Sequence, residues 1–234
     1  MGGIMYQFNE FEQRELLDSA LAEQVANLLS AAVKIKGKAS LAVSGGSTPK
    51  GFFQALSKKK IAWHAITITL ADERWVDIDS TDSNTKLVHE YLLQNEAIKA
   101  KFFHLKQGEA LTEETLADLN LAAEQQLLPL DVLILGMGED GHTASLFPCS
   151  DEIVQCLALD SEALLKVVPK TAPYQRISFS FAALAKSKTT FLHISGVSKK
   201  QVLAKAIAGQ ECKEMPIRAF LQAPDVNTQV YWAE

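Results

Sequence analysis

Stretches in which apolar residues recur at helical spacing alternate along the chain with short apolar runs typical of strands, and this pattern predicts alternating helices and strands. Six apolar residues recur at helical spacing near the start, which predicts a long amphipathic helix ending near Gly37: Leu17, Leu21, Val25, Leu28, Leu29 and Ala32. The short apolar run SLAVS (40–44) is typical of a buried strand. The segment GGSTPKGFFQAL predicts a turn into a helix with Thr48 as its cap and Pro49 at its first position, and AITITLADE predicts the next strand.

The same alternation continues to the end of the chain. It predicts helices near residues 83–94, 113–128 and 198–208, and strands at FFHL, DVLILGM, LLKVV, RISFSF, TTFLHIS and TQVYW. Strands that alternate with helices are typical of an α/β fold with a parallel sheet. We therefore expect a single doubly wound, mostly parallel sheet with helices on both faces, in a single domain over residues 1–234.

Composition and charge narrow the classes of protein. The 234 residues are 47% hydrophobic, which suffices for one substantial core. No apolar run reaches the roughly 18 residues of a membrane span, and the N-terminal stretch shows no secretory signal. The cysteines Cys149, Cys156 and Cys212 form no Cys-x-x-Cys pair. We expect a cytoplasmic protein with reduced thiols and no membrane contact, present as a monomer or a weak homodimer. Its net charge of −5, with Lys and Arg dispersed along the chain, argues against nucleic acid as a partner.

Four polar clusters each follow a predicted strand. They are GGST after 40–44, ADERWVDIDSTDSN after ITITL, GEDGHT after DVLILGM, and SGVSKK after TTFLHI. Ligands of open α/β sheets bind outside the carboxyl ends of the strands. The four clusters therefore predict one site at one edge of the sheet.

The first two clusters suit an anionic ligand. In SGGSTP, free backbone N–H groups of Gly45, Gly46, Ser47 and Thr48 at a strand-to-helix turn would attract a phosphate, although an ordinary glycine turn explains the pattern equally well. In ADERW, an extended backbone places Asp72 and Arg74 on one side and Glu73 on the other. A structural ion pair is the alternative interpretation of that pair.

The third cluster spells Gly-x-Gly-x-x-Gly over residues 136–141, the pattern of a dinucleotide-binding loop. Glu139 and Asp140 lie inside it, and each carboxylate roughly 4 Å from a phosphate charge would cost about 4 kcal/mol. The loop also follows several elements instead of the first strand, so we reject a dinucleotide. The same acids favour acid–base chemistry at His142, because a carboxylate orients an imidazole.

The fourth cluster places Lys199 in the first turn of a helix that Ser198 would cap. A cation there is disfavoured by the helix dipole unless an anion lies nearby, which suggests a second phosphate contact. The remaining histidines, His64, His89, His104 and His193, show no metal-ligand spacing. We expect neither a metal nor another cofactor.

Together and in this order, the four clusters resemble the 6-phosphogluconolactonase family, which shares its fold with the glucosamine-6-phosphate deaminases. GEDGHTASLFP is the most specific part of the resemblance. It implies hydrolysis of 6-phospho-D-glucono-1,5-lactone, a step of the pentose phosphate pathway, with His142 as general base and with Asp72 and Asp140 as acids of the site. The resemblance also implies a phosphate-binding set made of Gly45, Gly46, Ser47, Thr48, Arg74, Lys199 and Arg176.

Two other functions remain alternatives. One is a sugar-phosphate isomerase or deaminase, whose family pattern carries an Asn-Glu pair where this chain has Leu146 and Phe147. A phenyl ring cannot relay protons, which favours the lactonase, unless Asp151 supplies the relay from another position. The other alternative is a non-catalytic sugar-phosphate sensor, although no helix-turn-helix or basic stretch precedes the clusters.

Overall fold

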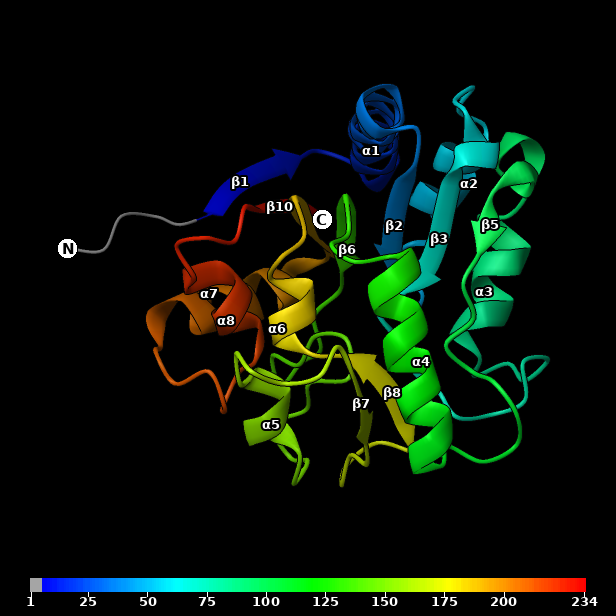
Figure 1. Ribbon diagram of the computed structural model, residues 1–234. Helices are drawn as coiled ribbons and strands as arrows, with labels where there is room; N and C mark the ends of the chain where they lie inside the picture. Colours follow the sequence, from blue (N-terminus) through cyan, green and yellow to red (C-terminus); the bar gives the residue numbers. More distant parts are fainter. Residues whose placement is uncertain (1–5) are drawn as a thin grey trace.

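A seven-stranded sheet, parallel at every neighbouring pair, forms the centre of the computed structural model (Figure 1). The structure describes residues 6–234; residues 1–5, part of the stretch that shows no secretory signal, lie outside the described residues. The strands run in the order β1 (Tyr6–Phe11), β10 (Thr228–Ala233), β9 (Thr189–Ser195), β6 (Val132–Leu135), β2 (Ala39–Val43), β3 (Ile66–Leu70) and β5 (Lys101–Phe102). The predicted parallel α/β fold is confirmed.

Helices connect these strands. They are α1 (Arg14–Lys36), α2 (Lys50–Ser57), α3 (Asn84–Tyr91), α4 (Glu113–Gln126), α5 (Ile153–Leu157), α6 (Phe181–Leu184), α7 (Val197–Ala208) and α8 (Ile217–Gln222), with 3₁₀ turns η1 (Trp63–Ala65) and η2 (Asn95–Lys99). The first helix ends at Gly37 in the left-handed conformation, as its pattern predicts. Strand β1, which precedes it, was not predicted. Within residues 6–234, no helix is long and apolar enough to cross a membrane.

The prediction of a single sheet is wrong in one respect. Strands β4 (Asp72–Arg74), β8 (Arg176–Phe179) and β7 (Leu164–Val167) form a separate antiparallel sheet. Strand β8 is buried along its whole length, like the inner strands β2 and β6 of the main sheet, so its apolar pattern does not reveal which sheet it joins. The second sheet brings Arg176 beside Arg74.

Two predicted helix caps are also wrong. Helix α2 begins at Lys50 with Pro49 in the capping position, and no side chain, including that of Thr48, caps it. Helix α7 begins at Val197 after Gly196, whose φ of 89° favours glycine, so Ser198 lies inside the first turn. The hydroxyl of Ser83, in contrast, accepts a hydrogen bond from the Lys86 N–H and caps α3. The backbone of Gly196 and Pro49 sets where these two helices start.

The order of strands creates a switch point between β2 and β6. From β2 the chain proceeds to β3 and β5 on one side, and from β6 it proceeds to β9 and β10 on the other. The two connections leave in opposite directions and open a crevice at the carboxyl ends of these strands. The four polar clusters follow β2, β3, β6 and β9, which are neighbours in the sheet.

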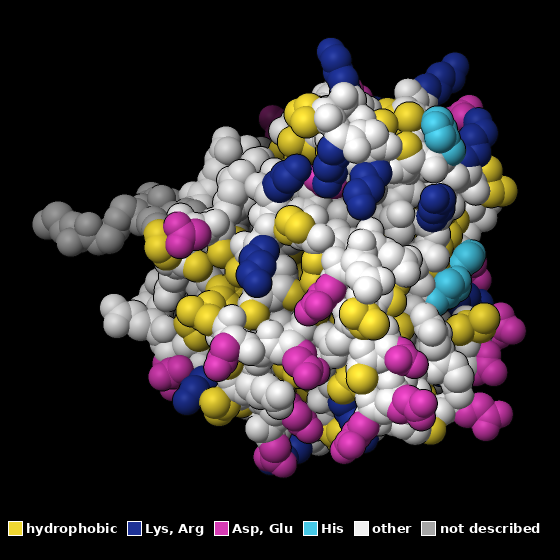
Figure 2. All heavy atoms as spheres, viewed as in Figure 1, with side chains coloured by type: hydrophobic (Ala, Val, Ile, Leu, Met, Phe, Trp, Pro, Cys, Tyr) yellow, Lys and Arg dark blue, Asp and Glu magenta, His cyan; other side chains and the backbone are white. Residues whose placement is uncertain are grey.

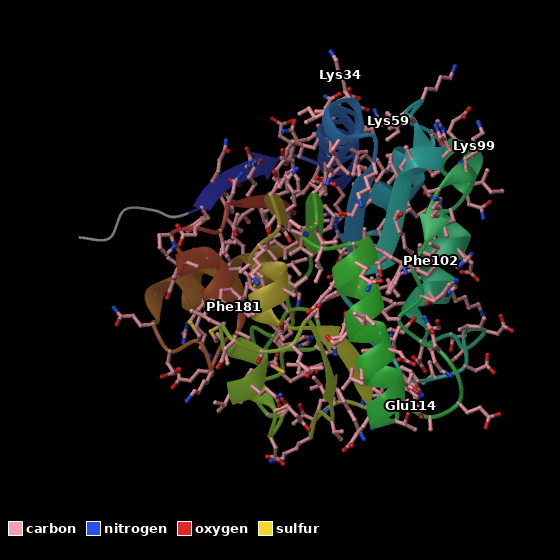
Figure 3. The ribbon with its side chains drawn as sticks, in the orientation of Figure 1. Lys34, Lys59, Lys99, Phe102, Glu114 and Phe181 are labelled. Atoms are coloured by element: carbon pink, nitrogen blue, oxygen red, sulfur yellow. The ribbon has the colours of Figure 1, made fainter. Side chains whose placement is uncertain are left out.

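Charge is unevenly distributed over the surface. Figure 2 shows Lys and Arg gathered at one end of the visible face and Asp and Glu at the other. Lys34, Lys59 and Lys99 lie at the basic end, above the starts of β2 and β3 and away from their carboxyl ends (Figure 3). Lys59 pairs with Glu23 and Lys99 with Glu96, so part of this charge is neutralised locally.

Candidate active site

A cavity of about 280 Å³ lies at the switch point of the sheet. All four polar clusters contribute to its wall, which confirms that they meet at one edge. Of the residues that the sequence singles out, its wall contains Gly45, Gly46, Ser47, Thr48, Asp72, Arg74, His142, Arg176 and Lys199. Asp140 lies just behind, bonded to His142. The size suits a small molecule of the kind that such crevices bind.

The imidazole of His142 is held from one side by a carboxylate. Its Nδ1 lies 2.6 Å from Oδ1 of Asp140, which also accepts the His142 backbone N–H at 3.1 Å. Because the carboxylate accepts, Nδ1 carries the proton, and Nε2 is left with its lone pair. Desolvation opposes ionisation of Asp140, but its hydrogen bonds and attraction to His142 hold the pKa of this carboxyl below its usual value. The pair has the geometry of an oriented general base.

An aromatic ring holds the same imidazole from a second direction. Phe147 stacks on His142 with ring centroids 4.1 Å apart and an interplanar angle of 30°. The ring of Phe147 also contacts Arg176, whose guanidinium carbon lies 5.4 Å from the ring centroid. Phe147 therefore packs against one face of the imidazole, at the sequence position where the deaminase pattern carries the Glu of its Asn-Glu pair. Asp151, the alternative relay, is exposed and pairs with Lys170 outside the cavity wall.

Two arginines lie at directly paired positions on neighbouring strands of the second sheet. Arg74 in β4 is the direct register partner of Arg176 in β8. Their Nε atoms are buried and have no hydrogen-bond partner within residues 6–234. Burial, and to a smaller extent the charge of Arg74, lower the pKa of Arg176, which Asp72 partly offsets. Like charges at directly opposed positions are unfavourable, so this pair is suited to an anion in the cavity.

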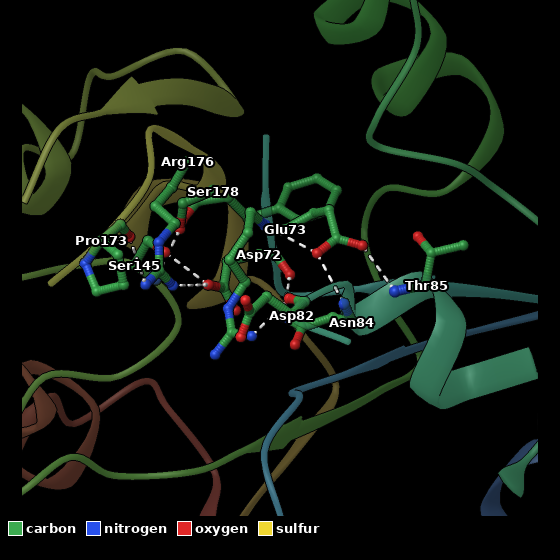
Figure 4. A network of polar contacts seen from close by, with 11 residues as sticks. Asp72, Glu73, Asp82, Asn84, Thr85, Ser145, Pro173, Arg176 and Ser178 are labelled. Carbon is green, nitrogen blue, oxygen red and sulfur yellow. Dashed lines mark hydrogen bonds and ion pairs between the residues drawn. The ribbon is translucent and has the colours of Figure 1, made fainter. Parts of the chain in front are cut away.

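Asp72 connects three parts of the site (Figure 4). Its Oδ2 accepts a hydrogen bond from the Ser145 hydroxyl at 2.5 Å and lies 3.8 Å from Nη1 of Arg176. Its backbone oxygen accepts from the side-chain amide of Asn84 at 3.0 Å. The expected alignment of Asp72 and Arg74 toward one cavity is confirmed, but the charged partner of Asp72 is Arg176, which the sequence did not indicate.

Glu73 points away from the cavity, as the strand period predicts, and performs a structural task there. Its carboxylate accepts the backbone N–H groups of Arg74, Asn84 and Thr85 at 2.8, 2.8 and 2.6 Å, and the Ser83 hydroxyl at 3.3 Å. Desolvation raises its pKa against these bonds. The carboxylate fixes the start of α3, a role for Glu73 that no pattern in the sequence indicates.

Lys199 lies in the first turn of α7, where a cation is disfavoured by the dipole. An anion is indeed nearby: Glu139 Oε1 lies 2.8 Å from the lysine Nζ. This ion pair links the loop that carries His142 to α7. It also explains the position of Lys199 without a ligand.

The structure contains no helix after the Gly-x-Gly-x-x-Gly loop of the kind that a dinucleotide needs. Residues 136–141 form an irregular loop with a turn at residues 139–140, and the next helix in the described chain begins only at Ile153. Within residues 6–234, His, Cys, Asp and Glu side chains form no cluster of three or more that could hold a metal ion.

Comparisons with known proteins agree on one family. A family model described as glucosamine-6-phosphate isomerases/6-phosphogluconolactonase matches residues 12–232. A 6-phosphogluconolactonase of Pseudomonas aeruginosa is 46% identical over 87% of this chain and 86% of its own length. One of Rhizobium meliloti is 41% identical over 95% of this chain and 97% of its own length. These matches confirm the resemblance that the four clusters carry.

Solved structures give the same result for the fold. A crystal structure of a 6-phosphogluconolactonase from Shewanella baltica is 41% identical, covers 99% of this chain and 100% of its own, and has a TM-score of 0.95. A monomeric glucosamine-6-phosphate deaminase has a TM-score of 0.80 at 20% identity, with 97% of each chain covered. The second likeness concerns the fold alone.

The role of Glu73 can be tested by Glu73→Gln. The amide places an N–H₂ group against backbone N–H donors and leaves at least one of them unpaired, so we expect a loss of about 2 kcal/mol in the free energy of unfolding. Urea unfolding measures this. Glu113→Gln, an exposed acid in the first turn of α4, is the matched control and should change stability by less than about 1 kcal/mol. Equal stability of the Glu73 variant and the wild type would contradict the role.

Proposed function

The chain belongs to the glucosamine-6-phosphate isomerase/6-phosphogluconolactonase family, and we propose that it hydrolyses 6-phospho-D-glucono-1,5-lactone to 6-phosphogluconate. The observation that carries the proposal is the placement of a carboxylate-oriented histidine and a pair of arginines in the wall of one cavity. The substrate has matching ends, with a phosphate dianion at C6 and an ester carbonyl at C1.

The phosphate end would lie against Arg74, Arg176 and the glycine loop. A dianion near the two guanidinium groups would relieve their repulsion and accept charge-assisted hydrogen bonds from them. The loop adds backbone N–H groups at the start of α2. Lys199 would join as a more mobile charge after it exchanges Glu139 for the phosphate.

The reacting end would lie at His142. Nε2 accepts a proton from a water molecule as its oxygen attacks C1, with Asp140 stabilising the imidazolium that forms. The tetrahedral intermediate then collapses, the bond between C1 and the ring oxygen breaks, and the proton passes from Nε2 to that oxygen. Anchoring the phosphate confines the ester to this position, which makes the attack effectively intramolecular. The reaction thus requires only a base, a water and an anchored ester.

The isomerase or deaminase alternative shares the fold, but its proton relay has no counterpart at the imidazole. Phe147 occupies that side of His142 and Asp151 lies outside the cavity wall. An amino sugar must open its ring before deamination, and by the family resemblance this step uses the Glu of the Asn-Glu pair as a proton relay in addition to the histidine. The site therefore favours the lactonase.

His142→Asn tests the base. Asparagine retains a polar side chain but cannot accept a proton at neutral pH, so we expect kcat for the lactone to fall by roughly 10² to 10⁴ while product still binds. Base consumption at constant pH, after subtraction of the spontaneous rate, measures turnover. His104→Asn, which lies outside the cavity wall, is the matched control. Unchanged turnover in the His142 variant would remove it from the mechanism.

Arg74→Ala tests the phosphate anchor. A charge-assisted hydrogen bond contributes about 1.5 to 3 kcal/mol, so kcat/KM for the phosphorylated lactone should fall at least tenfold. The value for unphosphorylated gluconolactone should change far less. Lys199→Ala should act in the same direction but more weakly, and Arg14→Ala, on the surface, should affect neither substrate. An equal loss on both lactones would show that Arg74 is structural.

The comparison of two activities separates the lactonase from the deaminase. At enzyme concentrations that hydrolyse the lactone readily, we expect no ammonia from glucosamine 6-phosphate and no ketose from glucose 6-phosphate. A coupled ammonia assay measures the first and chromatography the second. Ammonia release at a rate comparable to lactone hydrolysis, and lost again in His142→Asn, would assign the deaminase activity instead.

A further inference from the structure

Asn84 lies in the cavity wall with its side-chain amide in a defined orientation. It is the first residue of α3 and is only 3% exposed. Its Nδ2 lies 3.0 Å from the backbone oxygen of Asp72. A carbonyl oxygen only accepts, so the atom facing it must be the N–H₂ group. The remaining atom, Oδ1, is therefore an acceptor whose direction is known.

Among the described residues, no group donates a hydrogen bond to this oxygen. It is also not among the polar atoms that are sealed from solvent. Water or a ligand in the cavity must satisfy it, because an unpaired acceptor in so enclosed a position is costly. Figure 4 shows Asn84 beside Asp72, in the polar network that also contains Arg176.

The glycine loop is shaped around the same amide. A Cβ added at Gly45 would lie 1.9 Å from Oδ1 and 2.3 Å from Cγ of Asn84. The backbone of Gly45 does not have a positive φ, unlike that of Gly46. Glycine is thus required at position 45 by its contact with Asn84, and the backbone conformation does not require it.

The backbone that carries this amide is also held in place. Glu73 accepts the backbone N–H of Asn84 at 2.8 Å and that of Thr85 at 2.6 Å. The backbone at the start of α3 and the side-chain amide are therefore both fixed before a ligand binds. Such preorganisation is what a group that selects a ligand needs.

The charges nearby indicate which part of a ligand meets this oxygen. Arg74, Arg176 and Lys199 supply donors for a phosphate, whereas Oδ1 offers only lone pairs and would repel phosphate oxygens. It suits a hydroxyl hydrogen. Resting on the proposed function, we propose that Asn84 Oδ1 accepts a hydrogen bond from one of the free ring hydroxyls of the sugar lactone, at C2, C3 or C4, and so determines substrate specificity.

Deoxy analogues of the phosphorylated lactone, each lacking one of these hydroxyls, test the contact. We expect the wild type to lose roughly tenfold in kcat/KM on one analogue. For Asn84→Ala, kcat/KM on the parent lactone should fall by a similar factor, and removing that same hydroxyl from the substrate should cause no further loss. The ratios of kcat/KM between the parent lactone and the other two analogues should be the same in the variant as in the wild type. If Asn84→Ala lowered kcat/KM by the same factor on the parent lactone and on all three analogues, the proposal would be overturned, because Asn84 would then have a structural role or a role in orienting water.

A double-mutant cycle tests the packing that underlies the contact. Gly45→Ala in the wild type should displace the amide and reproduce the selective loss, whereas in the Asn84→Ala background the added methyl has room and should cost less than threefold. Additive losses would contradict the arrangement. Asn120→Ala, a buried asparagine of α4 outside the cavity wall, is the control for a general loss of stability.

The wild-type rate on the parent lactone distinguishes a failure of the lactonase assignment from a failure of the Asn84 contact. Hydrolysis by the wild type without selective effects in the variants would refute the role of Asn84 and leave the lactonase intact. No hydrolysis by the wild type would overturn the lactonase and, with it, the proposed hydroxyl contact.

Discussion

Two guanidinium groups occupy opposed positions in a short antiparallel sheet, and this placement concentrates positive charge in the wall of the cavity. Arg74 and Arg176 are register partners, and the carboxylate of Asp72 lies near only the second of them. Like charges placed this way are unfavourable unless an anion compensates them. The second sheet supplies core residues such as Ile177 and Phe179, and it also brings Arg176 to the cavity at the edge of the main sheet.

The hydrogen bonds around Asp72 connect this charged pair to the reacting group. Ser145, which bonds to Asp72, belongs to the loop that carries His142, and the ring of Phe147 contacts both His142 and Arg176. A change at the arginines would therefore also be felt at the imidazole. In the proposed reaction this linkage sets the distance between the anchored phosphate and the base, which is how binding energy at one end of a substrate assists chemistry at the other.

Local patterns in the sequence predicted most of the elements and the edge of the sheet at which the site lies. The runs of apolar residues identified the strands that precede the four polar clusters. The alternation of side chains along a strand placed Glu73 on the side opposite to Asp72 and Arg74. The second sheet was missed because strand pairing depends on contacts between distant segments, such as Arg74 with Arg176. Asn84 was missed for a similar reason: STDSN is typical of a helix cap, and the direct packing of Asn84 against Gly45, distant in the sequence, has no local signal.

The central claim is that one ligand is held with its phosphate between the arginines and its carboxyl carbon at His142. A crystal structure of the protein with the reaction product 6-phosphogluconate tests this most directly. We predict phosphate oxygens within hydrogen-bond distance of Arg74 and Arg176, and the product carboxylate within reach of Nε2 of His142. A product bound in the reverse direction, with its phosphate at His142, or bound outside the cavity would contradict the account.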